Sequence, residues 1–83
     1  MNFEEYQNAA QRTASTRDMC QKLDNGVLGL CGESGEVADV LKKYYFQGHG
    51  LDREKMLDEC GDVLWYLAEI AAGLGVTLDE VAR

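Results

Sequence analysis

Apolar residues recur at steps of three and four along this chain, which is the spacing of an amphipathic α-helix. The sequence contains no proline that would interrupt such a helix. We expect three long helices, over about residues 2–15, 25–46 and 52–74, with residues 16–24 as a connection or a ragged helix start. Short connections place consecutive helices antiparallel, so the pattern predicts an all-α antiparallel helical bundle.

Turn and cap residues mark the ends of the later helices. Gln47-Gly48-His49-Gly50 is a clear turn signal, and Asp52 is suited to cap the helix that follows. Gly73 and Gly75 end that helix. Thr77-Leu78-Asp79-Glu80 has the capping-box form, which predicts a short C-terminal helix.

The second and third helices each carry an apolar stripe with acidic residues beside it. The stripe of the second helix consists of Val27, Leu30, Cys31, Val37, Ala38, Leu41, Tyr44 and Tyr45. The stripe of the third helix consists of Met56, Cys60, Val63, Leu67, Ile70 and Leu74. Glu33 and Glu36 border the first stripe, and Glu59 and Asp62 border the second. We therefore expect these four acids at the edge of the packed seam.

The spacing of the four acids indicates a metal site. Glu33 and Glu36 lie three residues apart, as do Glu59 and Asp62, so each pair shares a helix face. If the helices pack side by side, the carboxylates converge, and like charges at short range need a cation between them. Mg²⁺ fits because it takes oxygen ligands and also bridges phosphates. The competing interpretation is a set of solvated surface acids.

Glycines recur inside the two long helices. Gly26, Gly29, Gly32 and Gly35 stand at every third position of the second helix, and Gly61 lies in the third. An interior glycine costs about 1 kcal/mol relative to alanine. Close helix packing explains most of them. Clearance for a metal-bound phosphate is the alternative for Gly32, Gly35 and Gly61, which flank the acids.

Size and charge limit the possible functions. With 83 residues the chain is one small domain, and 15 acidic against 8 basic residues make it repel nucleic acid. No apolar run is long enough to cross a membrane and no signal peptide is evident, so we expect a cytoplasmic protein. The three cysteines lack the spacing of a zinc site or a disulfide framework.

The acidic motifs and their flanks resemble the MazG-like nucleotide pyrophosphohydrolases of the all-α NTP pyrophosphatase superfamily. The family's Glu-x-x-Glu and Glu-x-x-Asp motifs are similar to Glu33-Ser34-Gly35-Glu36 and Glu59-Cys60-Gly61-Asp62. The likeness covers nearly all of residues 1–83 and is carried by residues 29–39, Leu41-Lys42-Lys43, residues 58–68 and Glu5-Tyr6-Gln7. Similar members continue past the last helix with an Asn-x-x-Lys-Leu type segment that helps hold the nucleotide. This chain stops at Arg83, so we expect a single domain that lacks the segment.

The resemblance implies hydrolysis of nucleoside triphosphates, or dNTPs, to monophosphate and pyrophosphate with Mg²⁺, or with Mn²⁺ in its place. It implies a house-cleaning or nucleotide-pool role and assembly as a homodimer or a dimer of dimers. It makes Glu33, Glu36, Glu59 and Asp62 the metal ligands. Two alternatives stay open. One is a non-catalytic acidic module that dimerises or binds metal, and the other is a pyrophosphohydrolase for a modified or phosphoribosyl nucleotide.

Four residues near the motifs are candidates for further roles. Glu36 is the candidate base that accepts a proton from the attacking water. Lys42 and Lys43 suit phosphate, although paired lysines near a helix end also complement the helix dipole. Tyr66 follows Asp62 by one helical turn, so it is the candidate to stack on the base.

Overall fold

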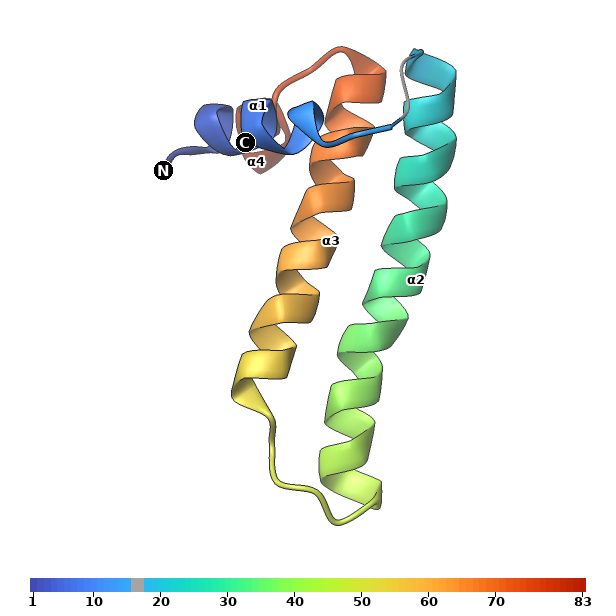
Figure 1. The fold of residues 1–83 in the computed structure, drawn as a ribbon, viewed down its shortest axis with the longest axis vertical. Helices are drawn as coiled ribbons and strands as arrows, with labels where there is room; N and C mark the ends of the chain where they lie inside the picture. Colours follow the sequence, from blue (N-terminus) through green and yellow to red (C-terminus); the bar gives the residue numbers. More distant parts are fainter. Residues whose placement is uncertain (16–17) are drawn as a thin grey trace.

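The structure, a computed structural model, describes residues 1–15 and 18–83, which form helices and contain no strand. The elements are α1 (Phe3–Arg12), α2 (Met19–Phe46), α3 (Arg53–Leu74) and α4 (Leu78–Ala82) (Figure 1). The predicted all-α fold is therefore confirmed. Within the described ranges, no helix combines the length and the apolar character needed to span a bilayer.

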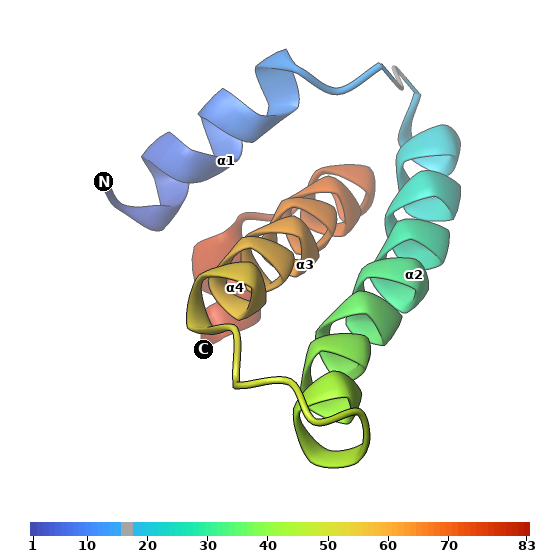
Figure 2. The same ribbon diagram turned by 60° about the horizontal axis from the view of Figure 1, so that its bottom comes forward.

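The long helices α2 and α3 run antiparallel and lie side by side, joined by a connection at one end of the molecule (Figure 1). Their interface is by far the most extensive in the described chain. Helices α1 and α4 contact each other and flank α3 on the side away from α2, as both views show (Figure 2). The candidate site therefore depends mainly on how α2 packs against α3.

Two helix boundaries refine the sequence-based expectation. Helix α2 begins at Met19, so residues 19–24 are the helix start that the sequence left open as one of two alternatives. The side chain of Asp18 accepts a hydrogen bond from the Gln21 backbone N–H at 2.8 Å and caps the helix. Helix α1 ends at Arg12, three residues early, and Thr13 caps it. Thr16 and Arg17 lie outside the described residues.

The face of α2 that packs on α3 is rotated from the predicted stripe. Gly26 is buried, and a Cβ atom there would overlap Ile70 of α3. A Cβ atom at Gly29 would overlap the ring of Tyr66. These close approaches turn the row that holds Glu33 and Val40 toward α3. Several residues of the predicted stripe, namely Val27, Cys31, Ala38, Leu41 and Tyr45, are consequently exposed.

The buried apolar core of the described chain is small. It consists of Ala10, Val40, Ala68, Ala71 and Leu78. Large apolar side chains instead remain exposed along both long helices, at Val27, Leu28, Leu41, Tyr44, Tyr45, Phe46, Leu57 and Leu74 among others. A single copy thus leaves much of its apolar surface in water.

A buried carboxylate ties α1, α2 and α3 together at the end far from the α2–α3 connection. Glu69 is 0% exposed, and it accepts hydrogen bonds from Asn25 Nδ2 at 2.9 Å and Gln11 Nε2 at 3.2 Å. Lys22 Nζ forms an ion pair with Glu69 at 3.4 Å and donates to Gln11 Oε1 at 2.6 Å. Because a buried charge is tolerated only with partners, this network fixes how the three helices meet.

Candidate metal centre

Three acids from two helices converge in the seam between α2 and α3. Glu33, Glu59 and Asp62 each offer one carboxylate oxygen, and these oxygens all lie within 4.8 Å of one another. Glu59 is only 6% exposed, Glu33 is partly buried and Asp62 is exposed. The cluster is therefore anchored inside the seam and open to solvent on the side of Asp62.

The crowding of negative charge affects the pKa of Glu33. Loss of solvent raises its pKa above the ordinary carboxyl value of 4.5, and the charge of Asp62 raises it further. A hydrogen bond with Glu59, the charge of Glu59 and the charge of Glu36 act in the same direction. Each effect penalises the ionised form, so the carboxylates gain from a cation among them.

The donor set fits a hard divalent cation. All three convergent atoms are carboxylate oxygens, which are the ligands that Mg²⁺, Mn²⁺ and Ca²⁺ prefer, whereas softer metals favour sulfur or imidazole. The glycines beside these acids leave open space, because a Cβ atom at Gly32, Gly35 or Gly61 meets nothing within 4 Å. The site can hold such a cation without steric obstruction from these positions.

Glu36, the fourth predicted ligand, lies one turn along α2 from Glu33. It is exposed and is not one of the three acids with mutually close oxygens, although its charge raises the pKa of Glu33. Glu36 also lines a cavity of about 430 Å³ near the α2–α3 connection, together with Asp39, Val40, Lys43, His49, Gly50, Asp52 and Lys55. It thus stands between the acid cluster and this cavity.

The two predicted phosphate lysines occupy different surroundings. Lys43 lines the cavity beside Glu36 and forms an ion pair with Asp39 at 3.1 Å. Lys42 is exposed on α2, and adjacent helical residues project about 100° apart. The geometry therefore favours Lys43 over Lys42 for contact with a ligand in the cavity.

Tyr66 lies beside the acids, on the α3 face that meets α2. With Glu33, Asp62 and Trp65 it lines a shallow hollow of about 350 Å³. Its ring meets that of Trp65 edge to face, with centroids 5.1 Å apart, and packs over the backbone of Gly29. Tyr66 is therefore both a packing residue of the helix pair and a wall of the hollow.

Two residues near the cluster were given no role at the site by the sequence reasoning. Lys55 Nζ forms an ion pair with Glu59 Oε1 at 2.9 Å, and the hydrogen bond and charge of Glu59 raise the pKa of Lys55. Their i, i+4 spacing was a usable signal. Burial raises the pKa of Tyr6 on α1, and the charge of Asp62 adds to this. Only the packing of α1 on α3 brings Tyr6 into this neighbourhood.

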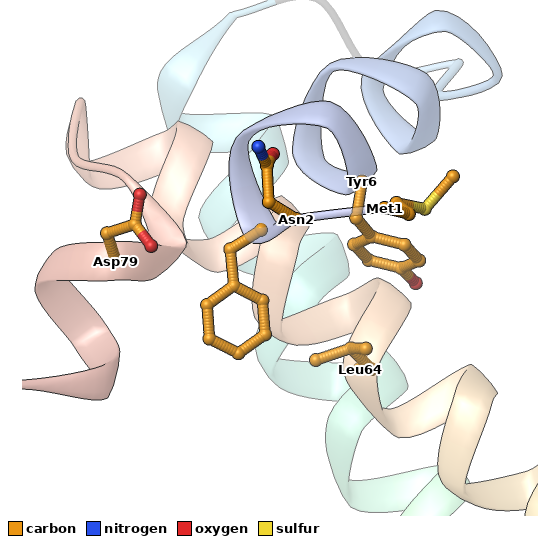
Figure 3. Close-up of a pocket in the computed structure, with 6 residues that line it drawn as sticks. Met1, Asn2, Tyr6, Leu64 and Asp79 are labelled. Carbon is orange, nitrogen blue, oxygen red and sulfur yellow. The ribbon is translucent and has the colours of Figure 1, made fainter.

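Tyr6 also borders an apolar hollow of about 500 Å³ between the start of α1, α3 and α4 (Figure 3). Its lining residues are Met1, Asn2, Phe3, Tyr6, Leu64 and Asp79. The close-up shows the Tyr6 ring extending from α1 toward α3, where Leu64 lies. With one carboxylate in its lining, this hollow lacks the converging acids that mark the seam of α2 and α3.

Comparisons with known proteins agree with this geometry. Residues 21–83, which include α2, α3 and α4 except the first two residues of α2, match the MazG nucleotide pyrophosphohydrolase domain. The chain is also similar to the Gene 37 protein of Mycobacterium phage L5, with 35% identity over 92 aligned positions that cover 100% of this chain and 81% of that protein. No solved structure gave a significant match. The convergent acids and the matched domain lead to one conclusion, that this chain belongs to the MazG nucleotide pyrophosphohydrolase family.

Proposed function

We propose that this protein is a Mg²⁺-dependent nucleotide pyrophosphohydrolase, which cleaves a nucleoside triphosphate or dNTP to monophosphate and pyrophosphate. The observation that carries the proposal is the convergence of Glu33, Glu59 and Asp62 from two helices within 4.8 Å. Membership of the MazG family supports the reaction type. A house-cleaning or nucleotide-pool role in the cytoplasm is part of the same proposal.

In this proposal Glu33, Glu36, Glu59 and Asp62 hold the ion, and Mn²⁺ can replace Mg²⁺. When bound, the ion supplies charge neutralisation for the triphosphate and a more acidic water. Glu36 accepts the proton of the attacking water, because it is exposed and lies at the margin of the three closest acids. The water oxygen forms a new bond to the α-phosphorus, and pyrophosphate leaves with the electrons of the broken anhydride bond.

In this proposal, different residues around the cluster contact different parts of the substrate. Lys43 lines the cavity beside Glu36, so it contacts the phosphate chain, and Lys42 contributes positive charge nearby. Tyr66 lines the hollow on the Asp62 side and offers an aromatic face to the base. The phosphate chain and the base of the bound substrate would thus extend from the acid cluster in different directions.

We also propose that two copies associate. The apolar stripes of α2 and α3 border a hollow of about 280 Å³ lined by Ser34, Val37, Cys60 and Val63. Cys60 and Asp62 project about 160° apart on α3, so the hollow leaves the Asp62 side of the cluster open, although Val63 follows Glu59 by one helical turn. A second copy can cover it without blocking access to the metal centre.

The test is product analysis with a panel of nucleoside triphosphates, with Mg²⁺ and with a chelator in its place. We expect monophosphate and pyrophosphate in equal amounts, and only with the metal. The matched pair of variants is Glu33→Gln/Glu59→Gln, which should be inactive, and Asp24→Asn/Glu54→Gln, which removes two exposed charges from the same helices. Diphosphate and phosphate as products would contradict the proposed reaction, and absence of turnover would favour the non-catalytic module.

A further inference from the structure

One lysine already forms an ion pair with a carboxylate of the acid cluster. Lys55 near the start of α3 places its ammonium 2.9 Å from Oε1 of Glu59. The Glu59 side chain is 8% exposed, whereas that of Lys55 is 56% exposed. The ammonium therefore reaches one of the least accessible carboxylates of the site from the solvent side.

The same lysine belongs to the cavity next to the cluster. Lys55 lines the cavity of about 430 Å³ together with Glu36 and Lys43. Lys43 approaches from α2 and Lys55 from α3, so two ammonium groups from different helices border one space. Lys55 stands at the boundary, with one partner in the acid cluster and one side toward the cavity.

We propose that Lys55 exchanges partners during the binding cycle. It neutralises Glu59 in the metal-free chain, and it donates to the phosphate chain of the ligand once Glu59 serves the metal ion. This inference rests on the proposed function of the site. It assigns to Lys55 a ligand-binding role that is distinct from that of the metal ligands.

The physical argument is competition for one carboxylate. An ammonium and a divalent cation repel each other at short range, so Lys55 loses its hold on Glu59 when the ion is present. The flexible stem of a half-exposed lysine can reorient at little cost. Phosphate oxygens in the adjoining cavity then accept its hydrogen bond in competition with Glu36 and Asp52, which line the same cavity.

This exchange predicts opposite effects of one substitution. Lys55→Gln removes the competing ammonium, so Mn²⁺ should bind the ligand-free variant roughly threefold or more tightly than the wild type. The same change removes a charged donor to phosphate, so Mn²⁺-tripolyphosphate should bind about tenfold more weakly. A lysine that only stabilises α3 through its ion pair would not produce this split.

Calorimetric titration measures both effects, first with Mn²⁺ alone and then with tripolyphosphate in saturating Mn²⁺. Tripolyphosphate isolates the phosphate contacts because it carries no base. Arg53→Gln is the matched control, since it removes one exposed charge two residues away on α3, and both affinities should stay unchanged. Lys55→Arg keeps the charge and should restore most of the wild-type values. Circular dichroism establishes that each variant is folded.

The possible outcomes separate this inference from the proposed function. If the wild type binds Mn²⁺ and tripolyphosphate and Lys55→Gln shifts both affinities in opposite directions, partner exchange is supported. If the wild type binds both but Lys55→Gln shifts neither, or shifts both in one direction, the exchange is overturned and the metal centre stands. If the wild type binds neither probe, the proposed function fails together with this inference.

Discussion

The ring of Tyr66 on α3 lies directly over the backbone of Gly29 on α2, where a Cβ atom would overlap it. Glu33 follows Gly29 by one helical turn, and Asp62 precedes Tyr66 by one turn. The contact between Gly29 and Tyr66 is therefore stacked next to the pair of acids that face each other across the seam. It sets the separation of the helices next to the cluster of Glu33, Glu59 and Asp62.

Gly29→Ala tests this relationship. The added methyl group must push Tyr66 away, so we expect a loss of about 1–3 kcal/mol in the free energy of unfolding and weaker Mn²⁺ binding. Gly32→Ala is the control, because its Cβ atom meets nothing within 4 Å and the better helix propensity should add up to about 1 kcal/mol. Chemical denaturation measures both. Equal stability of the two variants would show that the Gly29–Tyr66 contact does not constrain the helices.

The raised pKa of Glu33 predicts an unusual pH dependence of stability. The folded, metal-free chain binds this proton more tightly than the unfolded chain does, since the folded pKa lies above 4.5. The contribution of Glu33 to stability is therefore present at low pH and is lost as the pH rises from the unfolded pKa through the raised folded pKa. Bound metal should reverse this dependence, because it holds Glu33 ionised and so lowers the folded pKa below the unfolded one.

The measurement is thermal unfolding between pH 4 and pH 8, with a chelator and with Mn²⁺. The difference between wild type and Glu33→Gln isolates the contribution of this carboxyl, since glutamine cannot titrate. In the metal-free chain we expect the melting temperature of the wild type to fall relative to that of the variant as the pH rises. A difference that stays constant with pH would mean that the acids do not interact as the structure indicates.

Asp62 and Tyr66 should separate metal binding from substrate binding. Asp62→Asn removes a charge from the cluster, so we expect both Mn²⁺ affinity and turnover to collapse. Tyr66→Ala should leave Mn²⁺ binding nearly intact but weaken nucleotide binding by roughly 1–3 kcal/mol, the usual value of one stacking contact. Substrate kinetics well below the melting temperature are the measurement. An unchanged Michaelis constant and unchanged base selectivity in Tyr66→Ala would make Tyr66 a packing residue only.

Association of two copies predicts a specific sensitivity on α2. The wild type should sediment as a dimer or larger at micromolar concentration, because its own apolar core is small. Leu41→Lys, in the exposed stripe, should shift the population toward monomer. Leu28→Lys is the control, since this residue is 73% exposed and projects to a different side of α2. A compact monomer of the wild type would contradict the association.

The helices and the acidic seam were accessible from the sequence because both depend on local spacing. The i, i+3 pairs on two antiparallel helices were enough to bring Glu33, Glu59 and Asp62 together. The packed face of α2 was misjudged, because hydrophobic periodicity alone does not distinguish a stripe that is buried within the chain from one that stays exposed. Gly29 permits a close approach of α2 to α3, which decides the face of α2 that packs. The pattern of apolar residues carries no signal for this approach.

The contacts of Glu69 could not be predicted from the sequence. Its partners Asn25 and Gln11 lie 44 and 58 residues away, so they meet only after α1, α2 and α3 have packed. An isolated glutamate among apolar residues gives no local sign of such partners. The neighbourhood of Tyr6 and Asp62 arises in the same way, through the packing of α1 on α3.

The most direct test of the central claim is calorimetric titration of Mn²⁺ into the wild type and the Glu33→Gln/Glu59→Gln variant. If these acids form the metal centre, the wild type shows saturable binding and the double variant loses it. Asp24→Asn/Glu54→Gln, with the same change in net charge, should bind as the wild type does. Equal binding by all three proteins would contradict the account, because it would place the ion away from the seam between α2 and α3.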